Sequence, residues 1–178
     1  MFSDFRPVFK ILLRFLVLYV LLVLGYQLYL NLYKGAGLDP ASEWVARQTI
    51  FVQNLLDYPS QLVPGKPAQE TSWFWVSGRY VSRMVEGCNA VSVMILFVAF
   101  VIAFRGKWLT TAVFIFLGII VIHILNIARI ALLAIALLRF PESEEILHGV
   151  IFPAVIYGVV LLLWILWVNK FSLHAKKQ

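Results

Sequence analysis

Three residues combine chemical reactivity with a position at the end of an apolar segment. Cys88 and His148 each precede such a segment, and Arg129 lies near the end of another. Ionisable and reactive side chains are costly inside a membrane protein, so those near the ends of membrane helices carry a functional hypothesis by default. A thiol, an imidazole and a guanidinium on one membrane face are the groups that thiol acyl transfer requires.

Each of the three groups has a distinct role in such a reaction. The thiolate of Cys88 would be the nucleophile, and a helix N-terminus or a neighbouring cation favours that form. His148 would protonate the leaving amine and then deprotonate the incoming nucleophile, because imidazole titrates near neutral pH. Arg129 would stabilise the charge that develops on the attacked carbonyl oxygen. This chemistry needs no metal and no organic cofactor.

Four further polar residues are candidates for support or substrate binding. On a helix, Asn126 and His123 share a stripe with Arg129, so Asn126 could orient the guanidinium or the substrate. His123 could extend a hydrogen-bond network, or it could be satisfied by a neighbouring helix. Glu86 and Asn89 flank the cysteine and could tune its reactivity.

Each candidate also has a purely structural interpretation. A lone cysteine in a membrane helix most often serves packing. Arg129 could be an interfacial anchor that reaches lipid phosphates, and His148 could be a solvated loop residue near a run of glutamates. Composition and spacing therefore leave open a non-enzymatic membrane assembly or transport subunit, which would tolerate Cys88→Ala.

Two other enzyme classes fit the sequence less well. A membrane serine hydrolase is disfavoured because no G-x-S-x-G motif is present. Redox exchange and zinc binding are disfavoured because the single cysteine can form neither an internal disulfide nor a C-x-x-C pair. The thiol is expected to be free or intermolecular.

The composition places these residues in a membrane protein. Of the 178 residues, 62% are hydrophobic and 13% are charged, and the mean hydropathy is +0.88. Since a crossing helix needs about 20 apolar residues, the runs predict an all-α integral membrane protein with about four transmembrane helices. The expected crossings are residues 11–32, 88–104, 108–138 and 148–168. The third is too long for one ordinary crossing, so residues 126–138 would project outward, bend onto the interface, or form a fifth membrane helix.

Basic residues predict the orientation, because cytoplasmic loops are enriched in Lys and Arg. With both termini cytoplasmic, the inner segments, including the tail at 169–178, hold eight basic residues and one acid, Asp4. The outer segments hold the other seven basic and eight acidic residues. The three reactive residues then face outward, away from the cytoplasm. This topology accounts for the net charge of +6 without a nucleic-acid partner.

Residues 33–87 are the sizeable extramembrane segment, and their aromatic content predicts that they lie on the membrane surface. Asp39, followed by a proline, is a plausible cap for an interfacial amphipathic helix over about residues 40–57. Further prolines would end that helix and reverse the chain. Residues 73–81 are predicted to form a β-hairpin about a Ser-Gly turn, although their spacing also fits a helix.

The sequence around the reactive residues resembles that of exosortases and archaeosortases. Residues 85–90 (VEGCNA), followed by an apolar helix, look like the cysteine motif of that family, and residues 126–129 (NIAR) look like its Asn-x-x-Arg motif. His148 stands where the family places its histidine. The resemblance covers roughly residues 80–165 and is closest to the compact exosortases of flavobacterial type, although Cys-Asn-Ala replaces the commonest Cys-Ser-Gly.

The resemblance implies a membrane-embedded cysteine protease and transpeptidase, with Cys88, Arg129 and His148 as catalytic residues. Such an enzyme cleaves C-terminal sorting signals of secreted proteins and transfers them to a surface acceptor. The implied partners are membrane-anchored secreted substrates, a lipid or glycan acceptor, and the lipid bilayer.

Overall fold

The computed structural model describes residues 6–172. Most of them are helical, and the chain divides into two compact units. The first unit is built from the chain up to Leu28, Val91–Ile122 and the chain from Tyr157, and the second from Tyr29–Ala90 and His123–Ile156. Asp4 and residues 173–178 of the expected cytoplasmic tail lie outside the described residues.

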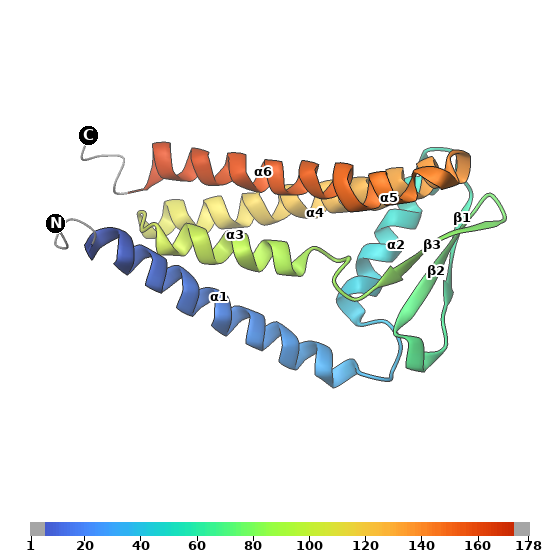
Figure 1. The fold of residues 1–178 in the computed structure, drawn as a ribbon, viewed down its shortest axis with the longest axis horizontal. Coiled ribbons are helices and arrows are strands. Elements are labelled where there is room, and N and C mark those ends of the chain that lie inside the picture. The colour runs from blue at the N-terminus through green and yellow to red at the C-terminus, as the bar shows by residue number, and fades with distance from the viewer. Residues whose placement is uncertain (1–5, 173–178) are drawn as a thin grey trace. The chain divides into compact units, whose positions relative to one another are not determined.

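Three helical stretches within residues 6–172 are long and apolar enough to cross a membrane: Val8–Tyr33, Trp108–Arg139 and Pro141–Phe171. The first belongs to α1 (Arg6–Tyr33), and the second is α4 (Trp108–Arg139) (Figure 1). The third consists of η2 (Pro141–Ser143), α5 (Glu144–Ile146), the π-helical η3 (Leu147–Ile151), α6 (Phe152–Leu166) and η4 (Trp167–Phe171). A further apolar helix, α3 (Val91–Ala103), has 13 residues. The chain is therefore a multi-pass membrane protein.

Helix α4 continues unbroken through residues 126–138, which the sequence left free to project outward, to bend onto the interface or to form a fifth membrane helix. It has 32 residues, so it is about 48 Å long, against about 30 Å for the hydrocarbon core of a bilayer. Residues 126–138 are the continuation of this one helix. They carry Asn126 and Arg129 into the second unit.

Aromatic side chains hold the first unit together. The rings of Phe100 and Trp164 stack with their centroids 4.3 Å apart. The indole N–H of the buried Trp167 donates to the carbonyl oxygen of Phe104 at 2.9 Å. Gly118 lies against the buried ring of Phe97, and any side chain at this position would overlap that ring. The close approach at Gly118 therefore depends on glycine.

In the second unit, α2 (Pro40–Leu55) begins as the sequence predicts. The side chain of Asp39 accepts a hydrogen bond from the backbone N–H of Ser42 at 3.0 Å. Pro40 occupies the first turn, where its missing N–H is not needed. The helix ends at Leu55, two residues before the expected end, and Asp57 has a left-handed φ of 62° that no α-helix continues.

A three-stranded antiparallel sheet follows α2, in the order β1 (Ser60–Pro64), β2 (Thr71–Val76), β3 (Arg79–Val85). The predicted hairpin is confirmed as β2 and β3, and the helical alternative is wrong. Ser77 and Gly78 both have positive φ, as a tight two-residue hairpin turn requires. Strand β1 was not predicted, because Pro64 is tolerated only on an edge strand. The all-α expectation is thus corrected to a mostly helical protein with one small sheet.

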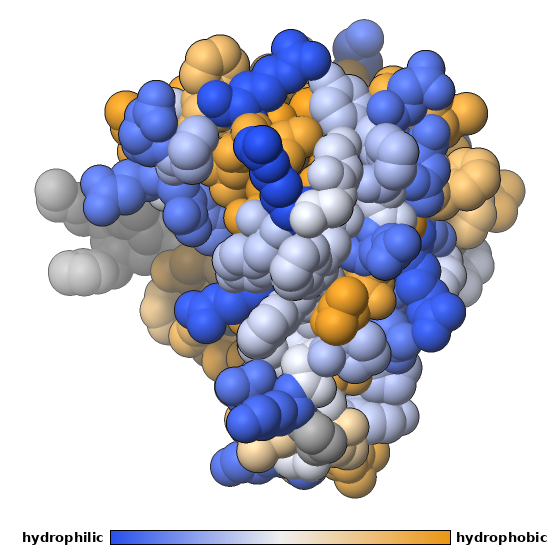
Figure 2. Space-filling view, turned by 90° about the vertical axis from the view of Figure 1, so that its right-hand side faces the viewer, coloured by the Kyte–Doolittle hydropathy of each residue, from blue (hydrophilic) through white to orange (hydrophobic). Residues whose placement is uncertain are grey.

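One hydrophobic cluster joins the elements of the second unit. Its buried members are Val45 and Ala46 of α2, Phe74 of β2, Met84 of β3 and Ile130 of α4. Burial of such side chains contributes about 1.5–3 kcal/mol each for the larger ones. Figure 2 shows one face of the molecule, on which hydrophilic residues gather with hydrophobic residues exposed between them.

Candidate active site

Cys88 lies in a tight turn after β3, and not on a helix. Helix α3 begins at Val91, which corrects the expectation of a helix that extends back to Cys88. The cause is local: Gly87 and Ala90 have φ values of 84° and 61°, and a right-handed helix accommodates neither. The thiol is free and half-buried.

Two asparagines tie this turn to neighbouring helices. The side-chain amide of Asn126, on α4, donates to the carbonyl oxygen of Cys88 at 2.8 Å. The side-chain amide of Asn89 donates to the hydroxyl of Ser42, on α2, at 3.0 Å. Both asparagines are buried. Since losing one partner of a buried hydrogen bond costs about 1–3 kcal/mol, these bonds restrict where the cysteine can lie.

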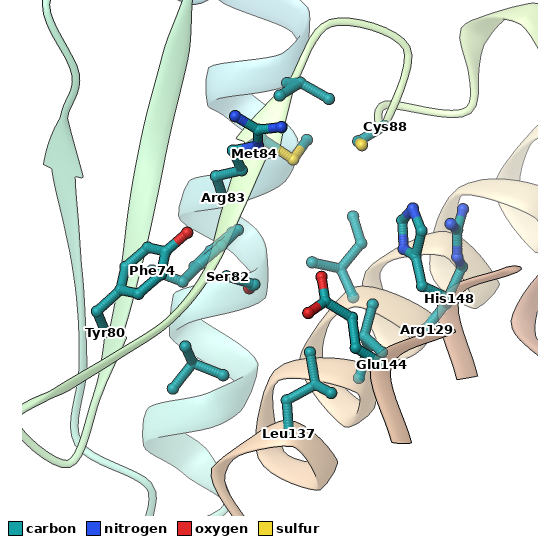
Figure 3. Close-up of a pocket in the computed structure, with 14 residues that line it drawn as sticks. Phe74, Tyr80, Ser82, Arg83, Met84, Cys88, Arg129, Leu137, Glu144 and His148 are labelled. Atoms are coloured by element: carbon teal, nitrogen blue, oxygen red, sulfur yellow. The ribbon is translucent and has the colours of Figure 1, made fainter. Parts of the chain in front are cut away.

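A cavity of about 390 Å³ brings together the three residues that the sequence places on one face, Cys88, Arg129 and His148. They come from the turn after β3, from α4 and from η3, respectively. The opposite wall is formed by β3. Figure 3 shows the side chains of Arg129 and His148 extending in the same direction, toward the turn that carries Cys88.

Arg129 has hydrogen-bonding capacity that the described part of the chain does not use. The residue is half-buried, and its Nε is buried without a hydrogen-bond partner among the described residues. Oδ1 of Asn126, one turn earlier on α4, is in the same condition. A buried polar atom of this kind calls for a partner, which a bound ligand or water can supply.

His148 sits in an irregular turn of helix. It is exposed and belongs to η3, the five-residue π-helical segment that precedes α6. Such segments are rare and are frequent at functional sites, because the added residue redirects the side chains around it. Glu144, one turn earlier, lines the same cavity.

The comparison with protein families assigns the chain to a known group. The family model of the transmembrane exosortases matches residues 1–168. The chain belongs to the transmembrane exosortase family. Exosortases have a general role as sorting transpeptidases in membranes and are generally cysteine transpeptidases. No curated protein and no solved structure matches the chain.

The four supporting candidates of this exosortase do not line the cavity. Asn126 and Asn89 instead hold the turn that carries Cys88. The other two candidates are His123 and Glu86. The ring of His123 stacks on Trp44 with centroids 4.7 Å apart, and its Nε2 lies 2.7 Å from Oε1 of Gln48. His123 is thus satisfied by the neighbouring helix α2.

Glu86 is half-buried and forms no ion pair with another residue in the range 6–172. Its partial burial raises the pKa of its carboxyl group, and the nearby carboxylates of Glu70 and Asp39 raise this pKa further. Lys34 acts in the opposite direction with a smaller effect. The carboxyl group therefore holds a proton to higher pH than a free glutamate does.

Four polar residues that line the cavity were not predicted from the sequence: Tyr80, Ser82, Arg83 and Glu144. The first three belong to β3, whose last residue lies three positions before Cys88. The predicted hairpin was the available signal, because a strand that leads directly to the cysteine places its side chains beside it. Glu144 had no comparable signal.

Proposed function

We propose that this exosortase is a cysteine transpeptidase that cleaves C-terminal sorting signals of membrane-anchored secreted proteins and transfers the cleaved chain to a surface acceptor. One observation carries the proposal: the single cysteine of the chain shares a cavity with Arg129 and His148. The family supports the class of reaction, and the cavity supports the choice of residues. The sequence motifs favour the compact flavobacterial subtype, and the acceptor is a lipid or glycan.

In the first half-reaction, the Cys88 thiolate attacks the carbonyl carbon of the scissile peptide bond. The new C–S bond forms as the carbonyl electron pair moves onto oxygen, and Arg129 stabilises that oxygen by hydrogen bonding. When the intermediate collapses to a thioester, the C–N bond breaks and the leaving amine takes a proton from the imidazolium of His148.

In the second half-reaction, the nucleophile of the acceptor attacks the thioester. His148, now neutral, removes the proton of that nucleophile. Collapse of the second intermediate breaks the C–S bond and restores the thiolate. Protons and electrons balance over the cycle, and no external oxidant or reductant takes part.

The side chains around the cavity suit a reaction in which negative charge develops. Because Cys88 is not on a helix, the expected influence of a helix N-terminus on its thiol does not apply. Arg83, Arg129 and His148 line the cavity against one carboxylate, Glu144. Positive groups at these positions would stabilise the negative charge that develops during the reaction.

Four crossings and an extracytoplasmic site complete the proposal. The crossings are α1, α3, α4 and the stretch Pro141–Phe171, with both termini in the cytoplasm of a bacterium and α2 and the sheet at the outer membrane surface. The distribution of basic residues supports this orientation. A helix as short as α3 spans only about 20 Å, so its crossing would include flanking residues or a locally thinned bilayer.

Labelling of single cysteines tests the orientation. Cys88 should react with a membrane-impermeant maleimide in spheroplasts whose membrane is intact, and Cys88→Ala is the blank. Lys107, exposed between α3 and α4, is expected on the other side. A Lys107→Cys, Cys88→Ala variant should therefore react only after permeabilisation. Labelling of both variants from outside would contradict the topology.

Processing of surface proteins tests the catalytic role. Candidate substrates are followed in cells that express the wild type or Cys88→Ala, with the membrane abundance of the enzyme measured in parallel. We expect processing to stop in Cys88→Ala at equal abundance, and a thioester to be trapped in the wild type. Normal processing by Cys88→Ala would instead indicate an assembly or transport subunit.

A further inference from the structure

Strand β3 is an edge of the sheet. It pairs with β2 on one side, and no described strand pairs with its other side. An edge strand presents a row of backbone N–H and C=O groups that another extended chain can bond to. Proteins usually protect such edges against pairing with another chain. An open edge beside a candidate active site therefore suggests that pairing has a function there.

The free side of β3 faces a recess that follows the strand from end to end. The cavity that contains Cys88 is lined by every residue from Tyr80 to Val85. A second cavity of about 200 Å³ is lined by Arg79, Tyr80 and Val81, and it shares Tyr80 and Val81 with the first. Both also share Leu137 of α4 on the opposite wall. Figure 3 shows this space between β3 and the helices.

The dimensions and the direction of β3 suit an extended peptide. The strand has seven residues, which corresponds to about 23 Å of extended chain. Cys88 follows three positions after its last residue. A peptide that runs along this edge would therefore pass the thiol as it leaves the strand.

A bulge in the sheet lies in the middle of this edge. The pairing of β2 and β3 shifts between Phe74 and Trp75, and Val81 has no partner of its own on β2. Bulges bend a strand, strengthen its twist and are over-represented next to active sites. Val81 lines both cavities, so the bend lies where they join.

We propose that the substrate binds as a fourth strand on the free edge of β3 and presents its scissile bond to Cys88 beyond the end of the strand. This inference rests on the proposed function, because it takes the peptide to be the substrate. Backbone hydrogen bonds supply the affinity in such an arrangement, and the side chains that line the groove supply the selectivity. The enzyme thus recognises an extended conformation before it recognises particular side chains.

Backbone pairing has a signature that recognition by side-chain pockets lacks. In a strand, the N–H groups of successive residues point to opposite sides, so every second residue of the substrate would donate to β3. Methylation of a backbone nitrogen removes that donor without changing the side chain. Its effect should therefore alternate along the peptide.

The probe is a peptide that spans the C-terminal sorting signal of a candidate surface protein. Each backbone nitrogen is methylated in turn, and binding to the full-length Cys88→Ala protein is measured together with cleavage by the wild type. We expect affinity to fall about tenfold at every second position over five to seven residues, with small effects between them. Losses without alternation, or no losses, would overturn strand pairing.

The two readouts separate this inference from the proposed function. Cys88→Ala keeps the edge of β3 but lacks the nucleophile, so alternating losses in binding support pairing even if no cleavage is found. Absence of cleavage by the wild type would then count against the catalytic role alone. Cleavage without alternation in binding would count against pairing alone.

A second copy of this chain is the competing occupant of the edge. Tyr80 is exposed on β3, so a Tyr80→Cys, Cys88→Ser variant carries its one thiol at the edge. We expect this variant to stay monomeric under mild oxidation. Efficient formation of a disulfide-linked dimer would show that the edge pairs with itself and would overturn the proposal.

Discussion

The two units of this exosortase differ in the number of polar side chains that they bury. Nine polar side chains are buried among the described residues, and eight of them belong to the second unit. The first unit holds only Ser172, whose hydroxyl bonds to the carbonyl oxygen of Val168 at 2.9 Å. Its packing comes from aromatic rings and from glycine.

The difference follows from what each unit has to specify. Helices in a bilayer associate through close van der Waals packing and small residues, because lipid gives no hydrophobic drive between them. A catalytic site needs directed contacts that hold a nucleophile in one geometry, and buried hydrogen bonds provide them. Variants of the packing residues in the first unit should therefore change stability alone, and variants of the groups that form the site or hold the cysteine turn should change the reaction.

The largest effect is expected for Arg129→Lys. Lysine keeps the positive charge but not the planar fork of donors, so the developing oxyanion loses directed hydrogen bonds. We expect the processing rate to fall about 100-fold or more at unchanged membrane abundance. Arg139→Lys is the matched control on α4, where the guanidinium bonds to the hydroxyl of Tyr58 at 2.7 Å. Full processing by Arg129→Lys would show that Arg129 does not stabilise the oxyanion.

Asn126→Ala should have the next largest effect. It removes the donor to the carbonyl oxygen of Cys88 and leaves that oxygen without this bond. We expect processing to slow about tenfold and alkylation of the Cys88 thiol to change its rate, with about 1–3 kcal/mol less stability. Gln48→Ala is the control: it removes the hydrogen-bond partner of His123 and should leave the alkylation rate of Cys88 unchanged. Equal alkylation in all three proteins would show that Asn126 does not position the cysteine.

Gly118→Ala addresses the first unit. The added methyl group would overlap the ring of Phe97, and overpacking of this kind costs about 1–3 kcal/mol. We expect a lower melting temperature in detergent with an unchanged processing rate per folded molecule. Gly158→Ala is the matched control, because nothing lies within 4 Å of its added atom. Equal destabilisation by both variants would argue against the Phe97 contact as the cause.

Glu86→Gln should have the smallest effect, and only above acidic pH. Because burial and the neighbouring carboxylates raise the pKa of Glu86 in the folded protein, its contribution to stability is present at low pH and is lost as the pH rises through that value. Glutamine avoids this loss. The variant should melt slightly above the wild type at pH 8 and together with it below about pH 4, where the carboxyl group is protonated. A difference that is equal at both pH values would exclude titration of Glu86.

Local signals in the sequence predicted much of this structure. Asp39 before a proline predicted the start of α2, and a Ser-Gly pair between alternating residues predicted the turn of the hairpin, since caps and turns depend on neighbours in the chain. The helical extension to Cys88 was wrong, because apolar character does not reveal the left-handed φ at Ala90. Strand β1 was missed because an edge strand carries little pattern of its own.

The sequence by itself determined that the chain is a mostly helical membrane protein and which three reactive residues to consider, because hydropathy, capping and motif residues are local properties. Only the tertiary structure decided that β3 forms the wall opposite Arg129 and His148, and that Asn126 holds the carbonyl of Cys88. The physical reason is distance along the chain. Asn126 and Cys88 are 38 residues apart, and a contact between such residues depends on how whole elements pack, which no local pattern encodes.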